Sequence, residues 1–328
     1  MEDIKVSVII PVYGVESFIE RCAESLLNQT LDNVEFIFVN DATPDNSVNI
    51  IKQVIAKYPQ RADYCKIITH EENRGLPSAR NTGLAHSTGD YIFHCDSDDY
   101  VEPTMLEDMY HSAIENKADI VWSDWYLTYA KTERYMHQPS YDTPLDAIKS
   151  MLSGGMKFNV WNKLVSRSLY SDNNICFPDG CGMGEDMTMI MLFVHAKKVM
   201  YLPKAYYHYV KLNSGAFSQT YSNKHLEELQ CNVQRIEQYI RTHYSGELDK
   251  EIAYLKLDVK FPFLISGDAD KHKLWKAWYP EANRYIEKTP YISTRSYILQ
   301  RLAAANQFWL ISIYYKIVYK FIYNILYK

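Results

Sequence analysis

Three carboxylates are crowded into four positions of the segment "HCDSDDY", residues 94–100, directly after the strand-like run "GDYIF". Alternation along an extended turn sends Asp96 and Asp98 to one side of the chain and Ser97 to the other. Mg²⁺ and Mn²⁺ accept such hard oxygen ligands, and Mg²⁺ usually keeps its other positions for water and phosphate oxygens. The D-x-D pattern therefore favours a divalent cation that carries a diphosphate. The alternative is a capped turn leading into the helix at Pro103, and the motif alone does not separate the two.

Two further polar residues follow strand-like runs nearby. Tyr13 ends the run "KVSVIIPVY", and Asp41 comes after "VEFIFVN". Ligands of parallel α/β sheets gather at the carboxyl ends of the strands. We therefore expect Tyr13, Asp41 and the acids of residues 96–99 to converge on one rim of a sheet.

The elements that must position these residues alternate between strand and helix. The apolar runs predict buried parallel strands, and the intervening segments have helical periodicity. Beyond residue 104 the pattern shifts to a helix, a strand, two helices and two strands, and beyond about residue 218 it reads as helical throughout. The first four predicted strands are 5–13, 34–39, 65–70 and 90–95, and the last two are 198–202 and 205–210.

The composition is that of a globular enzyme. The chain has 328 residues, of which 47% are hydrophobic and 23% charged, so it is long enough for two structural parts. A formal net charge of -5 argues against nucleic acid as the main partner. The six cysteines show no paired spacing and the N-terminal segment does not resemble a signal peptide, so we interpret the cysteines as reduced cytosolic thiols.

Several longer segments together resemble glycosyltransferase family 2, whose catalytic domain has the GT-A fold. The resemblance spans roughly residues 4 to 215, and its segments stand in the order of the family. It implies a Rossmann-like, mostly parallel central sheet with flanking helices as a catalytic domain over residues 1–217, followed by a helical region over 218–328. The segments that carry it are "VSVIIPVYGVESFIERCAESLLNQT", "FIFVNDATPDNS", "ENRGLPSARNTGL", "GDYIFHCDSDDYVEP", "VWNKLVSRSLY" and "GEDMTM".

The resemblance implies roles for the residues of the donor site. Pro11 and Tyr13 match the positions that hold the nucleotide base, and Asp41 matches the acid that pairs with uracil in UDP-sugar enzymes. Asp98 matches a direct metal ligand, and Asp96 an acid that contacts the ribose or the metal. The role of Asp99 stays open. The family often has two acids where this chain has "ND" at 40–41, which leaves the choice of donor less certain.

Other basic and aromatic residues match positions around the diphosphate and the sugar. Arg74 and Arg80 border the diphosphate, although Arg80 could equally be a cation on a helix surface. Trp161 and Lys163 match the segment near the sugar pocket, and Trp161 fits the core nearly as well. The remaining candidates lie in a stretch that returns to the diphosphate in related enzymes: His208 as a ligand of the metal or a contact of the leaving phosphate, with Lys211 and Ser214 as phosphate contacts.

A second acid pair, Glu185 and Asp186, matches the "ED" near the acceptor site of the family. An inverting transfer needs one base for the proton of the acceptor hydroxyl. Adjacent residues of a helix do not share a face, and Asp186 is in register with an inward apolar row. We therefore predict Asp186 as the base and Glu185 as an orienting or acceptor-binding group. The alternative is a pair of acids that interact with a helix dipole.

The segment "FWLISIYYKIVYKFIYNILYK", residues 308–328, is apolar and aromatic with lysines at wide spacing. The lysines make it a poor transmembrane span, whereas a helix at the membrane surface would fit, because lysines can reach headgroups. Packing against residues 222–290 or against a second subunit of a homodimer fits as well. Amphipathicity does not separate these readings.

Taken together, the motifs predict an inverting glycosyltransferase that uses Mn²⁺ or Mg²⁺. It would move a hexosyl or N-acetylhexosaminyl group from a UDP-sugar to a saccharide or polyprenyl-linked saccharide in surface polysaccharide synthesis. We expect it in the cytoplasm, with contact to the inner face of the cell membrane as an option. One alternative is a nucleotidyltransferase of NDP-sugar synthesis, although "PVYGVESF" offers a single glycine for a phosphate loop. Another is a non-catalytic protein that binds nucleotide or carbohydrate.

Overall fold

The computed structural model describes residues 3–213 and 222–318, and the chain folds as two compact units. The first consists of residues 1–147 and 158–236, and the second of residues 148–157 and 237–328. The predicted boundary near residue 217 stays a prediction. Among the described residues, no helix is both long and apolar enough to cross a membrane.

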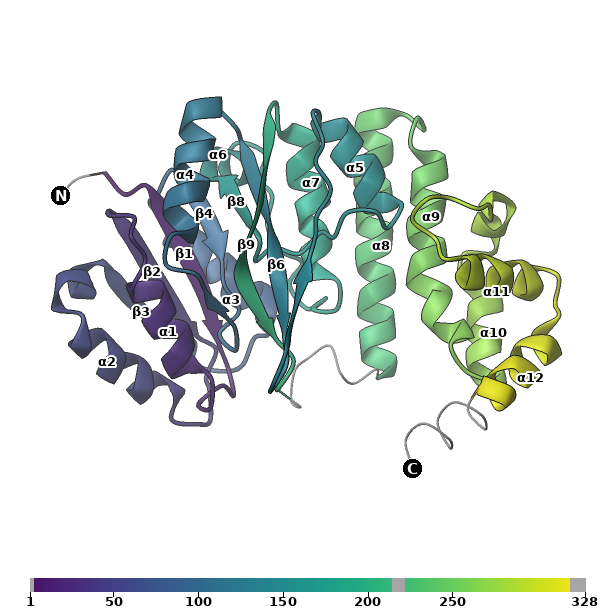
Figure 1. Cartoon of the computed structure of the whole chain (residues 1–328), viewed down its shortest axis with the longest axis horizontal. Coiled ribbons are helices and arrows are strands. Elements are labelled where there is room, and N and C mark those ends of the chain that lie inside the picture. Colours follow the sequence, from purple (N-terminus) through teal and green to yellow (C-terminus); the bar gives the residue numbers. More distant parts are fainter. Residues whose placement is uncertain (1–2, 214–221, 319–328) are drawn as a thin grey trace. The chain divides into compact units, whose positions relative to one another are not determined.

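The first unit is built on a mixed nine-stranded sheet with helices on it (Figure 1). Its strand order is β3-β2-β1-β4-β8-β6-β9-β5, with β7 paired to β6. The α/β prediction is confirmed. The strands are β1 (Val6–Val12), β2 (Val34–Asn40), β3 (Cys65–Thr69), β4 (Tyr91–His94), β5 (Tyr100–Val101), β6 (Ile120–Thr128), β7 (Glu133–Met136), β8 (Lys163–Ser166) and β9 (Val199–Val210).

The sheet is parallel only in its N-terminal half. β3, β2, β1 and β4 pair in parallel, whereas β8 pairs antiparallel with both β4 and β6. β1 and β2 are buried along their whole length, which explains why their sequences are continuous apolar runs. The two strands predicted at 198–202 and 205–210 form the single strand β9, whose register against β6 shifts near Asp124.

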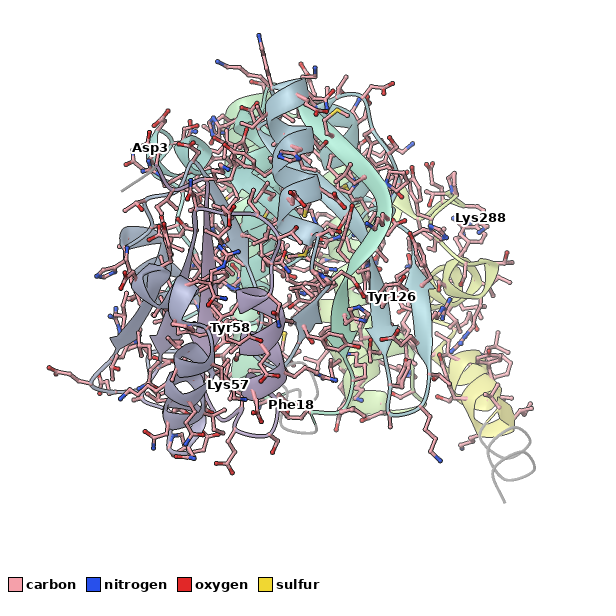
Figure 2. All side chains as sticks on the ribbon, turned by 60° about the vertical axis from the view of Figure 1, so that its left-hand side comes forward. Asp3, Phe18, Lys57, Tyr58, Tyr126 and Lys288 are labelled. Atoms are coloured by element: carbon pink, nitrogen blue, oxygen red, sulfur yellow. The ribbon has the colours of Figure 1, made fainter. Side chains whose placement is uncertain are left out.

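Helices cover this sheet closely. Gly83 in α3 lies against β1 so tightly that a Cβ there would come within 2.3 Å of Ile9 Cγ2. At the outer surface, Nζ of Lys57 lies 2.9 Å from a carboxylate oxygen of Glu20 and 2.8 Å from one of Glu24, which joins α2 to α1 (Figure 2). The helices that begin in this unit are α1 (Ile19–Leu27), α2 (Ser47–Lys57), α3 (Leu76–Ala85), α4 (Met105–Asn116), α5 (Pro144–Leu152), α6 (Arg167–Ser171), α7 (Thr188–His195) and α8 (Asn223–Tyr244).

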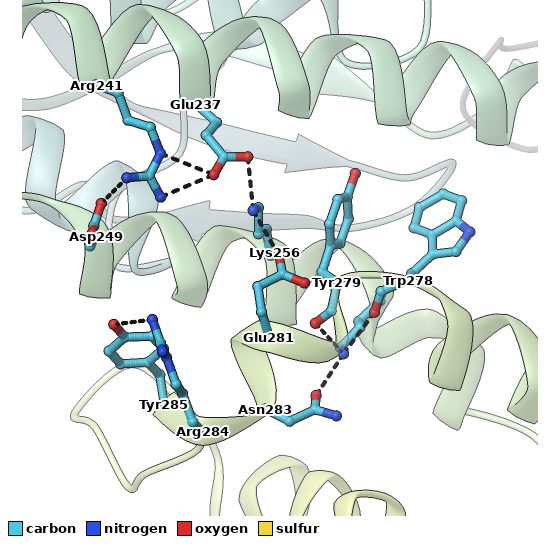
Figure 3. Close-up of polar contacts among 11 residues, drawn as sticks. Glu237, Arg241, Asp249, Lys256, Trp278, Tyr279, Glu281, Asn283, Arg284 and Tyr285 are labelled. Atoms are coloured by element: carbon cyan, nitrogen blue, oxygen red, sulfur yellow. Dashed lines mark hydrogen bonds and ion pairs between the residues drawn. The ribbon is translucent and has the colours of Figure 1, made fainter. Parts of the chain in front are cut away.

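The second unit is helical, as predicted, and buried lysines hold part of it together (Figure 3). Nζ of Lys260 is fully buried and donates to the carbonyl oxygens of Trp278 and Tyr279 and to Oδ1 of Asn283. Lys256 pairs with Glu237 at 2.8 Å. The helices that begin in this unit are α9 (Asp249–Lys260), α10 (Ala269–Ala277), α11 (Thr294–Ala304) and α12 (Phe308–Val318).

Candidate functional site

The loop after β4 presents two of its acids and buries the third. Asp96 and Asp98 are partly exposed, whereas Ser97 and Asp99 are buried, as alternation along an extended segment requires. Oδ2 of Asp99 accepts the hydroxyl of Tyr207 at 2.7 Å, and Oδ1 accepts the backbone N–H of Val210 at 2.7 Å. Asp99 therefore holds the loop to β9.

The environment of Asp99 explains why its charge is tolerated. Burial, together with the neighbouring charges of Asp98 and Asp96, raises the pKa of Asp99 well above its usual range. The hydroxyl of Tyr207 also accepts the backbone N–H of Asp96 at 3.0 Å. Tyr207 thus fixes two residues of the acidic loop, a role that the sequence did not indicate.

Asp96 and Asp98 have the chemistry of a cation site. Oδ2 of Asp98 accepts a hydrogen bond from Asn213 at 2.9 Å, and burial, reinforced by the charge of Asp96, raises the pKa of Asp98. A divalent cation would relieve this repulsion. Within residues 3–213 and 222–318 no group of three potential metal ligands occurs, so water and phosphate oxygens would have to complete the coordination. Two carboxylates fit Mg²⁺ or Mn²⁺ bound in that way.

Arg80 lies inside the protein between the two acid pairs. Its side chain is 1% exposed, and its Nη2 lies 2.9 Å from Oδ1 of Asp96 and 3.5 Å from Oε1 of Glu185. Nε and Nη1 are buried without a hydrogen-bond partner among the described residues. The alternative of a cation on the helix surface is therefore wrong. Arg80 joins the acidic loop to the predicted base segment, 16 and 105 positions away in the chain.

Glu185 and Asp186 stand on a 3-10 turn, Glu185–Met187, that leads directly into α7. Gly184 before it has a φ of 90°, a left-handed conformation that suits glycine. Glu185 is buried and Asp186 is partly exposed. The less buried of the two acids is thus the one predicted as the base.

The two acids of this pair have different proton affinities. Burial and the charge of Asp186 raise the pKa of Glu185 to about 8, against the opposing effect of Arg80. Burial raises the pKa of Asp186 to about 6, and the cations Arg80 and Lys163 limit the increase. Near neutral pH, Asp186 is therefore ionised and Glu185 is protonated. This division suits one base and one hydrogen-bond donor.

Lys163 is placed by the structure at the inner side of the site. Its side chain is fully buried, and Nζ donates to the backbone oxygen of Asn159 at 2.7 Å and to Oδ1 of Asn162 at 2.9 Å. Burial lowers the pKa of Lys163 to about 7, although the charge of Asp186 opposes the decrease. Its expected contact with the donor stays a prediction, whereas its influence on Asp186 is electrostatic.

Trp161 belongs to a buried aromatic stack. Its ring lies nearly parallel to that of Tyr207, with centroids 4.5 Å apart, and to that of Tyr209, with centroids 5.4 Å apart. Trp125 contacts it edge-on at 5.1 Å. The stack supports Tyr207, and through it the acidic loop. Lys211 lies beside this stack, with Nζ donating to the hydroxyl of Tyr209 at 3.0 Å, and its charge lowers the pKa of Asp98.

His208 is not brought to the predicted metal ligands. Nδ1 lies 2.8 Å from Glu133 and Nε2 lies 2.9 Å from Glu102, so both ring nitrogens already have carboxylate partners. Its ring is stacked between those of Tyr100 and Tyr126, at 4.1 and 4.7 Å (Figure 2). This geometry gives no support to His208 as a metal ligand. Alternation along β9 sends it to the face opposite Tyr207. Ser214 lies outside the described residues.

The nucleotide end of the site begins at β1. Pro11 is buried within the strand, and Tyr13 beyond it is 50% exposed, so its ring offers a free surface for a base. Gly14 turns the chain with a φ of 66°, and its N–H donates to the hydroxyl of Thr43 at 2.8 Å. The side chain of Arg74 is exposed.

Asp41 is buried and holds a loop as well as lying at the strand end. Oδ1 accepts hydrogen bonds from His70 Nδ1 at 2.7 Å and from the backbone N–H of Arg74 at 2.8 Å, and Oδ2 accepts the N–H of Gly75 at 2.7 Å. Nε2 of His70 lies 2.8 Å from the hydroxyl of Thr82. His70 is a second residue that the sequence did not indicate. The expected pairing of Asp41 with uracil stays a prediction, because most of its acceptor capacity is already used.

Comparisons with known proteins agree with this geometry. A family model described as "Glycosyl transferase family 2" matches residues 7–188. The chain is 35% identical over 213 residues to the uncharacterized glycosyltransferase EpsJ of Bacillus subtilis, covering 62% of this chain and 60% of that protein. It is 32% identical over 252 residues to the cholesterol galactosyltransferase of Borreliella burgdorferi, covering 71% of this chain and 68% of that protein.

Solved structures share the fold. The structure of S. aureus TarS 1-349 in complex with UDP-GlcNAc superposes with a TM-score of 0.68 at 20% identity, over 95% of this chain and 92% of that one. The mannosyltransferase PcManGT from Pyrobaculum calidifontis, in complex with GDP-Man and Mn2+, gives a TM-score of 0.52 at 16% identity, over 94% of this chain and 88% of that one. At these identities the likeness concerns the fold. The family match and these neighbours confirm the predicted GT-A-like α/β architecture with a helical C-terminal region.

Proposed function

The chain belongs to glycosyl transferase family 2, and we propose that it transfers a sugar from a UDP-sugar to a saccharide or lipid-linked saccharide acceptor. The observation that carries the proposal is the position of Arg80, whose Nη2 lies 2.9 Å from Asp96 and 3.5 Å from Glu185. This contact brings the acids expected at the donor diphosphate next to the acids expected at the acceptor. A transferase needs these two sets of groups within one site.

The residues of the chain divide the chemistry between them. Tyr13 offers a ring for the uracil, and Asp41 positions the loop that carries Arg74. Asp186, ionised near neutral pH, accepts the proton of the acceptor hydroxyl as that oxygen attacks the anomeric carbon. The bond from that carbon to the diphosphate breaks on the opposite face. One displacement with inversion results, without a covalent enzyme intermediate.

Asp96 and Asp98 would hold Mn²⁺ or Mg²⁺ together with the phosphate oxygens. When bound, the cation supplies Lewis-acid stabilisation of the charge that develops on the leaving UDP. The mannosyltransferase neighbour contains Mn2+, and the donor set here is chemically suited to it. Protonated Glu185 can donate a hydrogen bond to the acceptor or the donor sugar.

The acceptor class is the least constrained part of the proposal. The related enzyme of Borreliella burgdorferi is named for galactose transfer to cholesterol, a lipid acceptor, and the TarS structure contains UDP-GlcNAc. The chain spans about 60% of EpsJ, so the activity and substrates are inferred for this chain alone. A role in surface polysaccharide synthesis, a cytoplasmic location at the inner face of the membrane, and a homodimer stay predictions.

A calorimetric titration with UDP tests the proposal directly. We expect UDP binding that is strengthened by Mn²⁺, and loss of the Mn²⁺ effect in Asp98→Ala. The matched control is Asp179→Ala, which removes a carboxylate that bonds Ser78 and Asn81. Absence of UDP binding with or without Mn²⁺ would contradict the proposal.

A donor panel then separates the alternatives. Incubation with UDP-sugars should release UDP, slowly with water and faster with a saccharide acceptor. A nucleotidyltransferase would instead release pyrophosphate from UTP and a sugar 1-phosphate. A non-catalytic binding protein would bind UDP without any turnover, and the same assay would reveal it.

A further inference from the structure

The outer face of α12 carries an apolar row that the fold does not use. Trp309, Ile313 and Ile317 recur every four residues and are 59%, 45% and 53% exposed. At 3.6 residues per turn, this spacing places them on one side of the helix. Lys316 is also exposed and falls on the same side. We call these four residues the α12 face.

The opposite side of α12 is fully engaged within its own unit. Ile311 and Tyr315 are buried, and the hydroxyl of Tyr315 accepts a hydrogen bond from Arg295 of α11 at 2.8 Å. The ring of Phe308 lies 5.0 Å from that of His272 in α10. These contacts anchor α12. Packing inside the unit therefore does not account for the exposed row.

The charge around the α12 face has one sign. Residues 288–328 contain six basic residues and no acidic residue, although the whole chain has a net charge of -5. Of the four that the structure describes, Arg301 and Lys316 are exposed. Basic side chains close to apolar and tryptophan side chains are typical of a protein surface that binds an anionic bilayer. The six are Lys288, Arg295, Arg301, Lys316, Lys320 and Lys328.

A second copy of the chain fits this face less well. A two-fold contact would place the same surface against itself, so two basic, acid-free segments would meet. Like charges in one interface oppose association. The bilayer headgroups have the complementary charge, and the lysine stem can lie along the apolar row while its ammonium reaches a phosphate.

We propose that the α12 face binds the surface of an anionic lipid bilayer, with Trp309, Ile313 and Ile317 inserted at the boundary and the basic side chains on the headgroups. The face commits α12 to lie along the bilayer without crossing it. This inference goes beyond the proposed transferase activity and does not require it.

Vesicle co-sedimentation of the full chain tests the inference. The probes are vesicles of phosphatidylcholine alone and vesicles with about 30% phosphatidylglycerol. We expect binding to the anionic vesicles that weakens as salt is added, because screening acts on exposed charges. The combined variant Trp309→Ser, Ile313→Ser, Ile317→Ser should bind at least about tenfold more weakly. Lys316→Glu should weaken binding to anionic vesicles and leave any binding to neutral vesicles unchanged.

Two controls keep the result interpretable. The variant Ile114→Ser, Ile265→Ser removes two isoleucines that are 50% and 47% exposed on other segments, and it should bind vesicles like the unchanged chain. UDP titration of each variant checks that the first unit is folded, and failure of UDP binding in all of them would contradict the transferase proposal alone. Wild-type levels of vesicle binding in the triple variant would overturn the membrane proposal. A dimer in light scattering that the triple variant loses would overturn it in favour of a second copy.

Discussion

The hydroxyl of Tyr207 lies 2.7 Å from Oδ2 of Asp99 and donates a hydrogen bond to it. The same hydroxyl accepts the backbone N–H of Asp96 at 3.0 Å. One side chain of β9 therefore fixes both the buried acid and the backbone of a presented acid. The geometry of the candidate cation site depends on this tyrosine, which need not touch the cation or the donor.

Tyr207→Phe should lower the free energy of unfolding by about 1–3 kcal/mol, because Asp99 then lacks a donor in a buried environment. The affinity for UDP in the presence of Mn²⁺ should fall as well, since the loop is less well held. Denaturant unfolding and calorimetry measure the two effects. Tyr209→Phe is the matched control, because it removes a hydroxyl of the same stack that bonds only a partly exposed Lys211. Equal effects of the two variants would refute the special role of Tyr207.

Asp186→Asn should reduce kcat by at least about 100-fold, because it removes the base that takes the acceptor proton. UDP binding should be retained, so that the loss appears in turnover. Steady-state kinetics with calorimetry separates the two quantities. Glu185→Gln serves as the comparison, since an amide replaces an acid that is protonated near neutral pH. An inactive Glu185→Gln beside an active Asp186→Asn would reverse the assigned roles.

The pH profile of kcat should show an acid limb with a midpoint near the pKa of Asp186, raised by burial to about 6. As the pH falls through this value Asp186 gains a proton and can no longer accept one, so kcat falls. Lys163→Met should move the limb to higher pH, because the cation at residue 163 favours the ionised carboxylate. Lys204→Met, which removes an exposed lysine paired with Asp108, is the control and should leave the limb in place. An unchanged midpoint in Lys163→Met would exclude this electrostatic role.

Arg80→Met should lower the free energy of unfolding by about 3–5 kcal/mol, because Asp96 and Glu185 lose the buried cation between them. Combining it with Glu185→Gln should cost less than the sum of the two changes, since one of the stranded acids is then neutral. A double-mutant cycle by denaturant unfolding measures the difference. Should Arg80→Met not accumulate, recovery of soluble protein in the double variant gives the same information. Strictly additive effects would show that the pair is not coupled.

The fold and the two acid pairs were predictable because they rest on local patterns. Continuous apolar runs identified β1 and β2, and polar residues directly after strands identified Asp41 and Asp96. The GT-A-like architecture followed from the order of such segments. The two-residue strand β5 and the exposed β7 have too little apolar pattern to be found in this way.

Partners distant in the sequence could not be predicted, because no local pattern records them. Asp99 and Tyr207 are 108 positions apart, so the use of the third acid stayed open until β9 was placed. Arg80 was judged by its position on a short helix, whereas its burial is decided by Glu185 from another segment. His208 illustrates the same limit, since its two carboxylate partners come from β7 and from the residue after β5.

The contact of Arg80 with Asp96 and Glu185 also constrains how this site can be altered by evolution or by engineering. A charge change at any one of the three positions leaves an uncompensated ion in the interior, so neutral drift must pass through paired replacements. Libraries that randomise these positions singly will recover mostly unfolded chains. Randomising the three positions jointly gives access to variants in which donor and acceptor preferences change without loss of the fold.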